Sequence, residues 1–323
     1  MEELICAPVI IPTLNRAEHF VRCIESLKKC KYAERTEIFI SVDFPFLKRH
    51  EEGYDKIKKY LKGTFSEFKE MHVYYQEHNL GASLNLEFLI GKVSEQFDRY
   101  IIAEDDNEFS YNFLEYIDKG LMLFENDENV LNICSMQGDG PWINSEENAF
   151  YIQICPAYGL GCWKKKEEKL RKVDINYFIT GIGKDYSKMK RVFCKSKMCY
   201  QQLIEGVLWK RNPIFFLNDE IRWCDTMRSI YAISEDMYFI APQVSKIRNW
   251  GFDGSGENMK KQDMDPYQMW SFDEERFFDY NLSFDSTLVD TYNQYIDGSG
   301  CKVFWGYIII ATLKYFLCRI RGM

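Results

Sequence analysis

The feature that most constrains the fold is a repeated alternation of short apolar runs and helical patterns in the first 136 residues. Apolar runs occur at residues 7–12, 38–42, 73–76 and 100–103, with another at 130–136. Between them lie segments with helical spacing of apolar residues, as at Phe20, Ile24 and Leu27. Repeated strand–helix units predict an α/β fold with a mostly parallel central sheet flanked by helices.

Polar residues follow three of these strands at the point where each strand ends. Asn15 and Arg16 follow the first strand, Asp43 follows the second, and residues 104–106 follow the strand at 100–103. The carboxyl ends of neighbouring parallel strands share one edge of the sheet, and ligands bind there in folds of this class. We therefore expect the three polar groups to line one cleft.

The strand–helix rhythm stops at Gln137, and the later pattern is less regular. Neither an internal repeat nor a low-complexity linker marks a separate second domain. We expect one domain with two halves, residues 1–136 and 137–260, followed by a C-terminal helical extension at 261–323.

Charge and residue usage narrow the classes of function. Lys and Arg total 41 against 49 Asp and Glu, a net charge of −8, which disfavours a nucleic-acid partner. The 11 cysteines are scattered and form no Cys-x-x-Cys pair, which favours a reduced compartment. The first residues are acidic and do not resemble a signal peptide, so the expected location is cytoplasmic.

Missing motifs exclude further classes. The chain has no G-x-x-x-x-G-K-[ST] loop, and Gly181 and Gly183 lack the third glycine of a dinucleotide fingerprint. The sequence therefore lacks the motifs that would indicate a kinase or a dehydrogenase. None of the 4 histidines lies beyond His78, so proton chemistry in the second half must rest on carboxylates.

Three consecutive acids, Glu104, Asp105 and Asp106, close the strand at 100–103. In an extended chain Glu104 and Asp106 point to one side and Asp105 to the other. Adjacent carboxylates repel one another unless they are solvated or offset by a cation, and oxygen ligands suit Mg²⁺ or Mn²⁺, which in turn bind phosphate oxygens. The alternative is a solvated acidic turn at the start of the next helix, and the cluster alone favours that alternative.

Four motifs occur in order in the first half: PVIIPTLNR at 8–16, ISVD at 40–43, NLGASLN at 79–85 and EDD at 104–106. With these motifs in register, the first half resembles a GT-A nucleotide-sugar glycosyltransferase. Together with AYGLGCW at 157–163, NDEIRWCD at 218–225 and the segment 241–256, the chain resembles bacterial surface-polysaccharide glycosyltransferases of the family 2 type. It resembles N-acetylglucosaminyltransferase I more distantly.

The resemblance implies that residues 1–136 bind a nucleotide-sugar and that 137–260 bind the acceptor. The residues implied to hold the nucleotide are Pro12, Thr13, Asn15, Arg16 and Asp43. Asp43 would accept a hydrogen bond from the uracil of a UDP-sugar. Each of these polar residues has an alternative interpretation as ordinary turn or cap chemistry.

The resemblance also implies roles for the third loop and the acidic triplet. Asn79 and Gly81 would lie against the donor, where a glycine permits close approach of the backbone. Asp106 would ligate Mn²⁺ or Mg²⁺, and Glu104 and Asp105 would lie nearer the sugar and ribose.

An inverting transferase needs a carboxylate to take the proton of the acceptor hydroxyl. The candidates are Asp219, Glu220 and Asp225, in a segment that resembles the family's Trp-Asp-Asp-Trp motif, although Cys224 interrupts the paired acids. We rank Glu220 first and Asp225 second. The alternative for all three is a solvated or salt-bridged helix face, with Arg222 and Arg228 as partners.

Lys246, Arg248 and the glycine-rich loop at 251–256 are expected to close over the diphosphate, with a plain surface turn as the alternative. Trp163 and Trp250 are candidates for stacking on sugar rings, although aromatic residues more often belong to a core.

The tail carries an apolar run of eleven residues, VFWGYIIIATL at 303–313, shorter than the ~20 residues of a membrane-spanning helix. Lys302, Lys314, Arg319 and Arg321 surround it. We expect the segment at 302–323 to contact the inner face of a membrane peripherally. The alternative is a helix packed on the core or on a second subunit.

Taken together, the sequence predicts a metal-dependent glycosyltransferase of inverting stereochemistry. The donor would be a nucleoside-diphosphate sugar, with a UDP-sugar preferred, and a hexosyl or N-acetylhexosaminyl group would move to a hydroxyl of a glycan or lipid-linked glycan in surface-polysaccharide synthesis. The alternatives are a sugar nucleotidyltransferase, whose basic triphosphate loop is missing, and a non-catalytic glycan-binding protein that keeps the fold. The sequence does not fix the oligomeric state.

Overall fold

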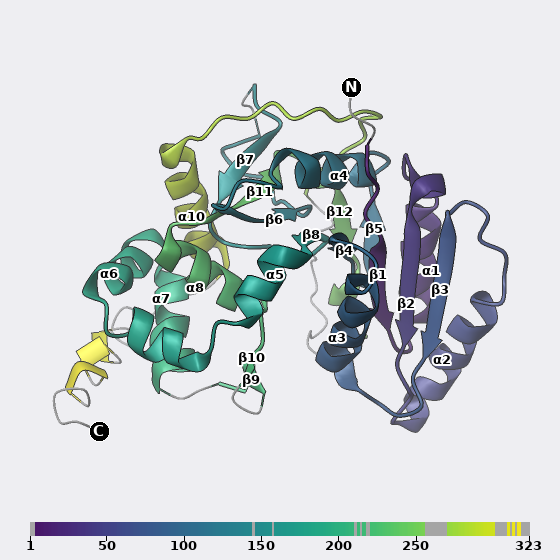
Figure 1. The fold of residues 1–323 in the computed structure, drawn as a ribbon, viewed down its shortest axis with the longest axis horizontal. Helices are drawn as coiled ribbons and strands as arrows, with labels where there is room; N and C mark the ends of the chain where they lie inside the picture. The colour runs from purple at the N-terminus through teal and green to yellow at the C-terminus, as the bar shows by residue number, and fades with distance from the viewer. Residues whose placement is uncertain are drawn as a thin grey trace.

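The computed structural model describes residues 4–143, 146–156, 158–209, 212–213, 215–217, 220–255 and 270–300, together with 309–310, 312–313 and 315–317. The fold is α/β, built on an eight-stranded sheet of order β3-β2-β1-β4-β8-β6-β11-β7 (Figure 1). Four of the seven pairings between neighbouring strands are parallel: β3–β2, β2–β1, β1–β4 and β6–β11. The predicted mostly parallel sheet flanked by helices is therefore confirmed.

Strands and helices alternate through the first half of the chain, as the sequence predicts. The elements are β1 (Val9–Thr13), α1 (Ala17–Leu27), β2 (Glu37–Val42), α2 (Lys48–Tyr60), β3 (Glu70–Tyr75), α3 (Gly81–Ser94) and β4 (Arg99–Ile102), with a short 3-10 helix η1 (Ala33–Arg35) before β2. In helix α2 only His50 is buried in the charged first turn, and the apolar spacing starts at Tyr54.

The second half introduces antiparallel pairing beside the parallel β6–β11 pair. Strand β8 (Leu160–Trp163) lies between β4 and β6 (Val130–Cys134) and runs antiparallel to both, and β7 (Ala149–Ile152) pairs antiparallel with β11 (Tyr238–Pro242). This change explains why the rhythm in the sequence stops at residue 137. The helices here are α4 (Phe113–Leu123), α5 (Lys164–Arg171), α6 (Tyr186–Lys195), α7 (Lys197–Gln202) and α8 (Asp225–Glu235), with π-helical turns at η2 (Tyr177–Ile182) and η3 (Leu203–Trp209).

Two small antiparallel pairs lie beside the main sheet. Strand β5 (Asn107–Phe109) pairs with β12 (Ile247–Asn249), and β9 (Phe216–Leu217) pairs with β10 (Glu220–Ile221). A short 3-10 helix, η4 (Gly251–Asp253), follows β12. The β5–β12 pair brings together segments that are about 140 residues apart. Strand β5 directly follows the acidic triplet, so β12 lies beside the triplet in space.

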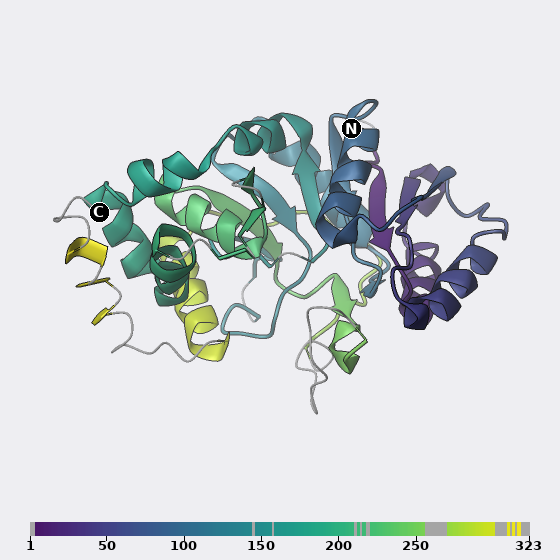
Figure 2. The ribbon, with the colours of Figure 1, turned by 90° about the horizontal axis from the view of Figure 1, so that it is seen from below.

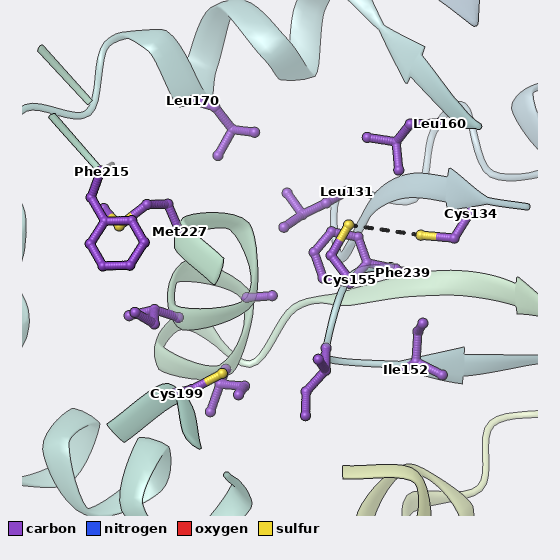
Figure 3. Close-up of a cluster of buried hydrophobic side chains, with 14 of the residues drawn as sticks. Leu131, Cys134, Ile152, Cys155, Leu160, Leu170, Cys199, Phe215, Met227 and Phe239 are labelled. Carbon is purple, nitrogen blue, oxygen red and sulfur yellow. Dashed lines mark hydrogen bonds between the residues drawn. The ribbon is translucent and has the colours of Figure 1, made fainter. Parts of the chain in front are cut away.

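The sheet has an apolar core on each face, because strand side chains alternate between its two sides. Val9 and Ile11 of β1 pack in one core with helices α1, α2 and α4. Ile10 packs in the other core with α3 and with helices α5 to α8. Figure 3 shows part of this second core, where the sulfur atoms of Cys134 and Cys155 lie 4.0 Å apart as thiols. All nine cysteines in the described residues are free.

The predicted C-terminal helical extension begins with α10 (Ser286–Gly300), which packs beside β7 and α6 (Figures 1 and 2). The ring of Tyr292 lies 5.1 Å from that of Trp142 and 5.8 Å from that of Phe150, measured between centroids. No helix within the described residues has both the length and the apolar character needed to cross a membrane. Much of the apolar run at 303–313 lies outside the described residues.

Candidate active site

The candidate site lies where β1, β2 and β4 end. Strand β1 lies between the other two in the sheet, so the three carboxyl ends are neighbours. Thr13 is the last residue of β1, and its carbonyl accepts a hydrogen bond from the Asp43 backbone N–H at 2.8 Å. The polar residues that the sequence places at strand ends therefore lie along one edge of the sheet.

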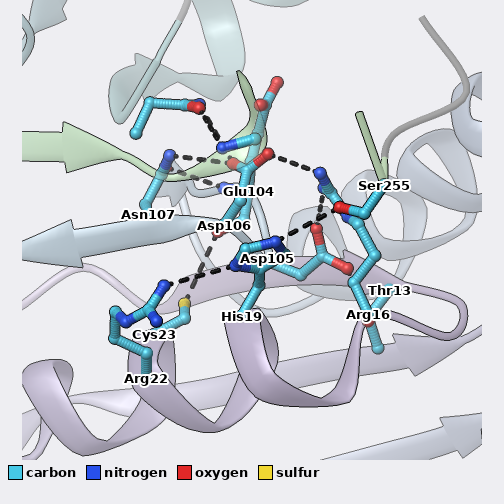
Figure 4. Close-up of polar contacts among 12 residues, drawn as sticks. Thr13, Arg16, His19, Arg22, Cys23, Glu104, Asp105, Asp106, Asn107 and Ser255 are labelled. Carbon is cyan, nitrogen blue, oxygen red and sulfur yellow. Dashed lines mark hydrogen bonds and ion pairs between the residues drawn. The ribbon is translucent and has the colours of Figure 1, made fainter. Parts of the chain in front are cut away.

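Arg16 and the acidic triplet form the centre of the site (Figure 4). The Arg16 guanidinium donates to Asp105 through Nη2 and to Asp106 through Nη1, the latter at 2.7 Å. The other Asp105 oxygen accepts from the Thr13 hydroxyl at 2.8 Å. Both aspartates are 5% exposed, whereas the Arg16 side chain is 19% exposed. A single guanidinium thus offsets two buried carboxylates that the sequence places side by side.

Strand β12 holds Asp106 from the other side. Asn249 Nδ2 donates to Asp106 Oδ1 at 3.0 Å, and the backbone N–H of Trp250 donates to the Asp106 carbonyl at 2.9 Å. Gly251 lies so close that a Cβ atom there would be 2.2 Å from Asp106 Oδ2. Sequence reasoning missed Asn249 as a site residue, although it lies within the quoted segment 241–256. The signal that identifies it is long-range strand pairing, which the segment does not reveal on its own.

Burial and like charge raise the pKa values of this corner. Glu104, which is half-buried, has its pKa raised to about 8 by burial and then by Asp106, with smaller effects from Asp105 and from Asp225 at the start of α8. Burial also raises the pKa of Asp106, while Arg16 opposes that shift. The corner therefore favours an added positive charge.

The second cluster of predicted residues surrounds Asp43, which is 3% exposed. Its Oδ1 accepts from the backbone N–H groups of Phe44 and Leu80, and its Oδ2 accepts from the Gly81 N–H at 2.9 Å and from Asn79 Nδ2 at 3.1 Å. These four bonds fill the acceptor positions of the carboxylate. Asp43 thus fixes the turn into α3, in which Gly81 adopts φ +74° with open space beside it.

The remaining residues that the sequence predicts for the nucleotide site lie at the end of β1 and just after it. Pro12 is half-buried on β1 and is in register with Ser41 of β2. The Asn15 carbonyl packs against α2, where a Cβ atom on Gly53 would lie 1.8 Å from its oxygen. A glycine at position 53 is therefore required for α2 to approach the loop.

The segment after β12 lies against α1. His19 Nε2 is 2.9 Å from Asp253 Oδ2 and 3.2 Å from the Ser255 hydroxyl (Figure 4). The Arg22 guanidinium lies over the Trp250 ring at 4.2 Å, and the Trp250 indole N–H donates to Glu108 at 2.8 Å. Trp250 is therefore half-buried in protein contacts at the rim of the site.

The structure describes two of the three candidate bases. Asp219 lies outside the described residues. Glu220 is exposed on β10, and Asp225 is exposed as the first residue of α8. The alternative interpretation required these acids to lie on one helix face. Glu220 lies instead on a two-residue strand, and only Asp225 lies on a helix, at its start.

The predicted arginine partners of these carboxylates bind elsewhere in the described part of the chain. Arg228 makes a buried bidentate ion pair with Glu167 of α5, at 2.7 and 2.8 Å, and Arg222 donates to the Ser83 hydroxyl in the first turn of α3. Arg228 Nε also donates to the Trp223 carbonyl at 3.1 Å. These contacts join the segment before α8 to α3 and fix the start of α8.

Two expectations for other residues are wrong. Lys246 is 2% exposed and forms an ion pair with Asp273, so its ammonium group is not available to close over a diphosphate. Trp163 is 3% exposed, and its indole N–H donates to the Leu121 carbonyl at 2.9 Å, so it is a core residue. Arg248 stacks on the Phe272 ring at 4.4 Å, and Gly256 lies outside the described residues.

The donor set of the acidic corner fits a hard divalent cation. Mg²⁺ and its analogue Mn²⁺ are usually held by one or two carboxylates together with substrate phosphates. The triplet offers such carboxylates, and a cation, the Arg16 guanidinium, already bridges Asp105 and Asp106. Asp106 is therefore a suitable ligand for a metal bound together with a diphosphate.

A second group of possible ligands lies at the opposite edge of the sheet. Within the described residues, Glu37, Glu70 and His72 place three ligating atoms within 4.8 Å of one another. Glu37 and Glu70 begin β2 and β3, whereas the candidate site lies where the parallel strands end. Lys69 pairs with Glu37 at 2.8 Å, so this group is already charge-compensated in part, and we assign it no metal.

No family model and no curated protein sequence matches the chain. Among solved structures the chain is similar to S. aureus TarS 1–349, with a TM-score of 0.42 and 10% identity over 75% of this chain and 59% of that one. It is also similar to a TarS 1–349 complex with UDP, with a TM-score of 0.32 and 18% identity over 45% of this chain and 40% of that one. A third similar structure is the mannosyltransferase PcManGT from Pyrobaculum calidifontis, in complex with GDP-Man and Mn²⁺. Its TM-score is 0.39, with 11% identity over 71% of this chain and 68% of that one.

The chain spans less than two thirds of either TarS structure, at 59% and 40% of their lengths. All three TM-scores are low, so we base no functional conclusion on these similarities.

Proposed function

We propose that this chain is a metal-dependent glycosyltransferase that moves a sugar from a nucleoside-diphosphate sugar to a hydroxyl group. The observation that carries the proposal is the corner at the ends of β1 and β4. There Asp105 and Asp106 are buried together and share the Arg16 guanidinium. Buried paired carboxylates at the carboxyl edge of a parallel sheet suit a ligand that arrives with its own cation.

The metal, when bound, would stabilise the negative charge that develops on the diphosphate leaving group. Asp106 would hold it, and Glu104 and Asp105 would lie toward the sugar and ribose. Thr13 keeps Asp105 oriented through its hydroxyl at 2.8 Å. Asp43 acts as a positioning residue in this proposal, because its four hydrogen bonds hold the Asn79 and Gly81 turn against which the donor would rest.

We propose Asp225 as the base of an inverting reaction, with Glu220 as the alternative. The base accepts the proton of the acceptor hydroxyl while the hydroxyl oxygen bonds to the anomeric carbon and the bond from that carbon to the diphosphate oxygen breaks. The support for Asp225 over Glu220 is its position, since Asp225 is the first residue of α8 whereas Glu220 lies on the two-residue strand β10. Arg228, one turn later on α8, fixes the Trp223 carbonyl and hence the start of the helix.

A UDP-sugar is the proposed donor, and the sugar is proposed to be a hexose or N-acetylhexosamine. The support is the motif pattern of the first half, with PVIIPTLNR, ISVD, NLGASLN and EDD in order. Asp43 is not assigned to the uracil, because four hydrogen bonds from the protein fill its acceptor positions. The test is a product assay with a panel of UDP-sugars and GDP-mannose in the presence of Mn²⁺. We expect turnover with a UDP-sugar and an Asp106→Ala variant that is folded and inactive. Full activity of that variant would contradict the proposed role of Asp106.

Adding a nucleoside triphosphate with a sugar phosphate, and a glycan alone, to this panel separates the two alternative functions. A sugar nucleotidyltransferase would release pyrophosphate from a nucleoside triphosphate and a sugar phosphate, whereas the proposed enzyme would not. A non-catalytic glycan-binding protein would bind a glycan without cleaving any nucleotide-sugar. The missing triphosphate loop argues against the first alternative, and the paired buried acids argue against the second.

A glycan or lipid-linked glycan of surface-polysaccharide synthesis is the proposed acceptor, presented at the inner face of a membrane. The support is an apolar surface formed by Ile309, Ile310, Leu313, Phe316 and Leu317, which are 38 to 58% exposed. Thr312 and Tyr315 hold this segment to the body through Tyr200, at 3.2 Å, and the Gly183 carbonyl, at 2.8 Å. Residues 301–323 contain basic but no acidic side chains, although the whole chain has a net charge of −8, which suits an anionic lipid surface.

Vesicle flotation tests this contact. We expect binding to vesicles with an anionic lipid, weaker binding to neutral vesicles, and loss of binding in a Leu313→Glu/Leu317→Glu variant. Thr312 and Tyr315 are left in place, so the segment keeps its contacts with the body. Equal flotation of the variant and the wild type would contradict the proposed membrane contact.

A further inference from the structure

We propose that Arg16 occupies the position of the divalent cation in the ligand-free protein, and that metal binding requires Arg16 to leave Asp106. This inference rests on the proposed function and adds a rule for how the site is loaded. One internal cation is exchanged for one external cation at the same pair of carboxylates.

The first observation is that protein donors occupy every oxygen of Asp105 and Asp106. Arg16 and Thr13 use the two oxygens of Asp105. Asn249 uses Asp106 Oδ1 at 3.0 Å, and Arg16 uses Asp106 Oδ2 at 2.7 Å. A metal that ligates Asp106 through Oδ2 must therefore share this oxygen with the Arg16 guanidinium or displace it, and two cations at one oxygen repel each other.

The second observation concerns access to Asp106 Oδ2. The backbone of Gly251 closes one side of this oxygen, since a Cβ atom there would lie 2.2 Å from it and 3.2 Å from Arg16 Nη1. Asn249 and Asn107 hold the other oxygen of the carboxylate, at 3.0 and 3.4 Å. The position left for an incoming cation is the one that the Arg16 guanidinium holds.

The third observation is that Arg16 is the most easily moved member of the cluster. It is at the N-cap position of α1, its side chain is 19% exposed, and the two aspartates are 5% exposed. Asn249, by contrast, is 2% exposed and fixed on β12. A guanidinium released from Asp106 stays at the same edge of the sheet, where it can pair with the diphosphate that accompanies the metal. Metal and nucleotide should therefore bind with positive coupling, each favouring the arrangement that the other needs.

Calorimetric titration with Mn²⁺ alone, in the absence of nucleotide, tests the exchange without an activity readout. Arg16→Gln removes the competing charge, so we expect Mn²⁺ to bind at least about fivefold more tightly than to the wild type. Arg16→Lys keeps a positive charge and should remain within about twofold of the wild type. Arg22→Gln is the matched control: it removes one charge from α1, but its side chain contacts His19 and Trp250 and not the aspartates. We expect this control to leave the Mn²⁺ affinity unchanged.

Thermal unfolding with and without Mn²⁺ provides a second readout if Arg16→Gln is less stable. The variant leaves two buried carboxylates without their counter-ion, so Mn²⁺ should raise its Tm more than it raises that of the wild type. Unchanged Mn²⁺ affinity and an unchanged Tm response in Arg16→Gln would overturn the exchange.

The outcome of this experiment is distinguishable from failure of the proposed function. If the wild type binds UDP with Mn²⁺ while Arg16→Gln shows no gain for Mn²⁺, the exchange is wrong and the metal site stands. If no variant binds Mn²⁺ or UDP, the metal site itself is wrong, and with it the exchange.

Discussion

The donor side and the acceptor side of the proposed site are built in different ways. Donor-side residues follow directly from strand ends: Thr13 ends β1, Asp43 follows β2, and the acidic triplet follows β4. Acceptor-side residues depend on contacts between distant segments, such as the Arg228–Glu167 ion pair between α8 and α5. A side chain placed by the end of a buried parallel strand is fixed by the sheet, whereas Asp225 is fixed only if α8 is correctly docked.

The largest expected effect is on catalysis at the acceptor side. Asp225→Asn removes the proposed base, so kcat should fall by about 10²- to 10⁴-fold while UDP binding is retained. Glu220→Gln is the matched control, because it neutralises a nearby exposed carboxylate on β10. Single-turnover measurements with saturating donor check both variants. If only Glu220→Gln loses activity, the base is Glu220 and the assignment of Asp225 is wrong.

The next effect is on the stability of the acceptor side. Arg228→Met leaves the carboxylate of Glu167, which is 3% exposed, without its bidentate partner. Breaking a buried pair in this way should lower the free energy of unfolding by about 3–5 kcal/mol. The double variant Arg228→Met/Glu167→Leu removes both charges and should recover most of that loss. Urea unfolding monitored by circular dichroism measures the difference, and equal stability of the single variant and wild type would contradict a structural role for the pair.

A smaller, pH-dependent effect is expected at Asp118, on the donor side but away from the site. Asp118 is fully buried on α4, it accepts from the Ala7 backbone N–H at 3.0 Å, and burial raises its pKa to about 8. Its folded pKa lies above the unfolded value of 3.8, so its contribution to stability is complete below about pH 4 and is lost as the pH rises through 8.

Asp118→Asn should remove this slope, which is at most about 1.4 kcal/mol per pH unit, since the amide oxygen still accepts from Ala7 and no proton is lost. Unfolding curves between pH 5 and 9 check the prediction, and a variant that keeps the wild-type slope would refute it. UDP binding should not change, because Asp118 lies near the start of β1 and the site lies at its end.

The smallest effect is expected at Gly81. A Cβ atom at this position meets nothing within 4 Å, so Gly81→Ala changes only the cost of the backbone at φ +74°. That cost is about 1–2 kcal/mol for a residue other than glycine. Ala82→Gly, next to it on α3, is a control for helix propensity. Chemical denaturation should show a lower free energy of unfolding for Gly81→Ala than for the wild type. Equal free energies of unfolding would mean that the turn held by Asp43 is not rigid.

The same contrast explains how much of the molecule could be predicted from the sequence. Apolar runs that end in polar clusters identify β1, β2 and β4 and place Thr13, Asp43 and Asp106 on one edge, because the geometry of parallel strands leaves no other choice. The antiparallel insertion of β8 between β4 and β6 is not visible in the sequence, because a short apolar run does not indicate its neighbours or its direction.

Long-range partners account for the rest. Asn249 reaches Asp106 only through the β12–β5 pair, and Lys246 is removed from the site by Asp273, 27 residues later. Charge patterns suggested Arg228 as a partner for nearby acids, but a buried guanidinium pairs with the carboxylate that packing brings to it, here Glu167. Prediction from sequence therefore succeeds where one strand fixes a residue and fails where two distant elements do.

The most direct test of the central claim is calorimetric titration of UDP into the full chain, with Mn²⁺ and with excess EDTA, for the wild type and Asp106→Asn. The account predicts that UDP binds to the wild type only when Mn²⁺ is present, and that Asp106→Asn loses this dependence together with most of its affinity. Equal binding of UDP with and without the metal, or a variant that behaves as the wild type, would contradict it.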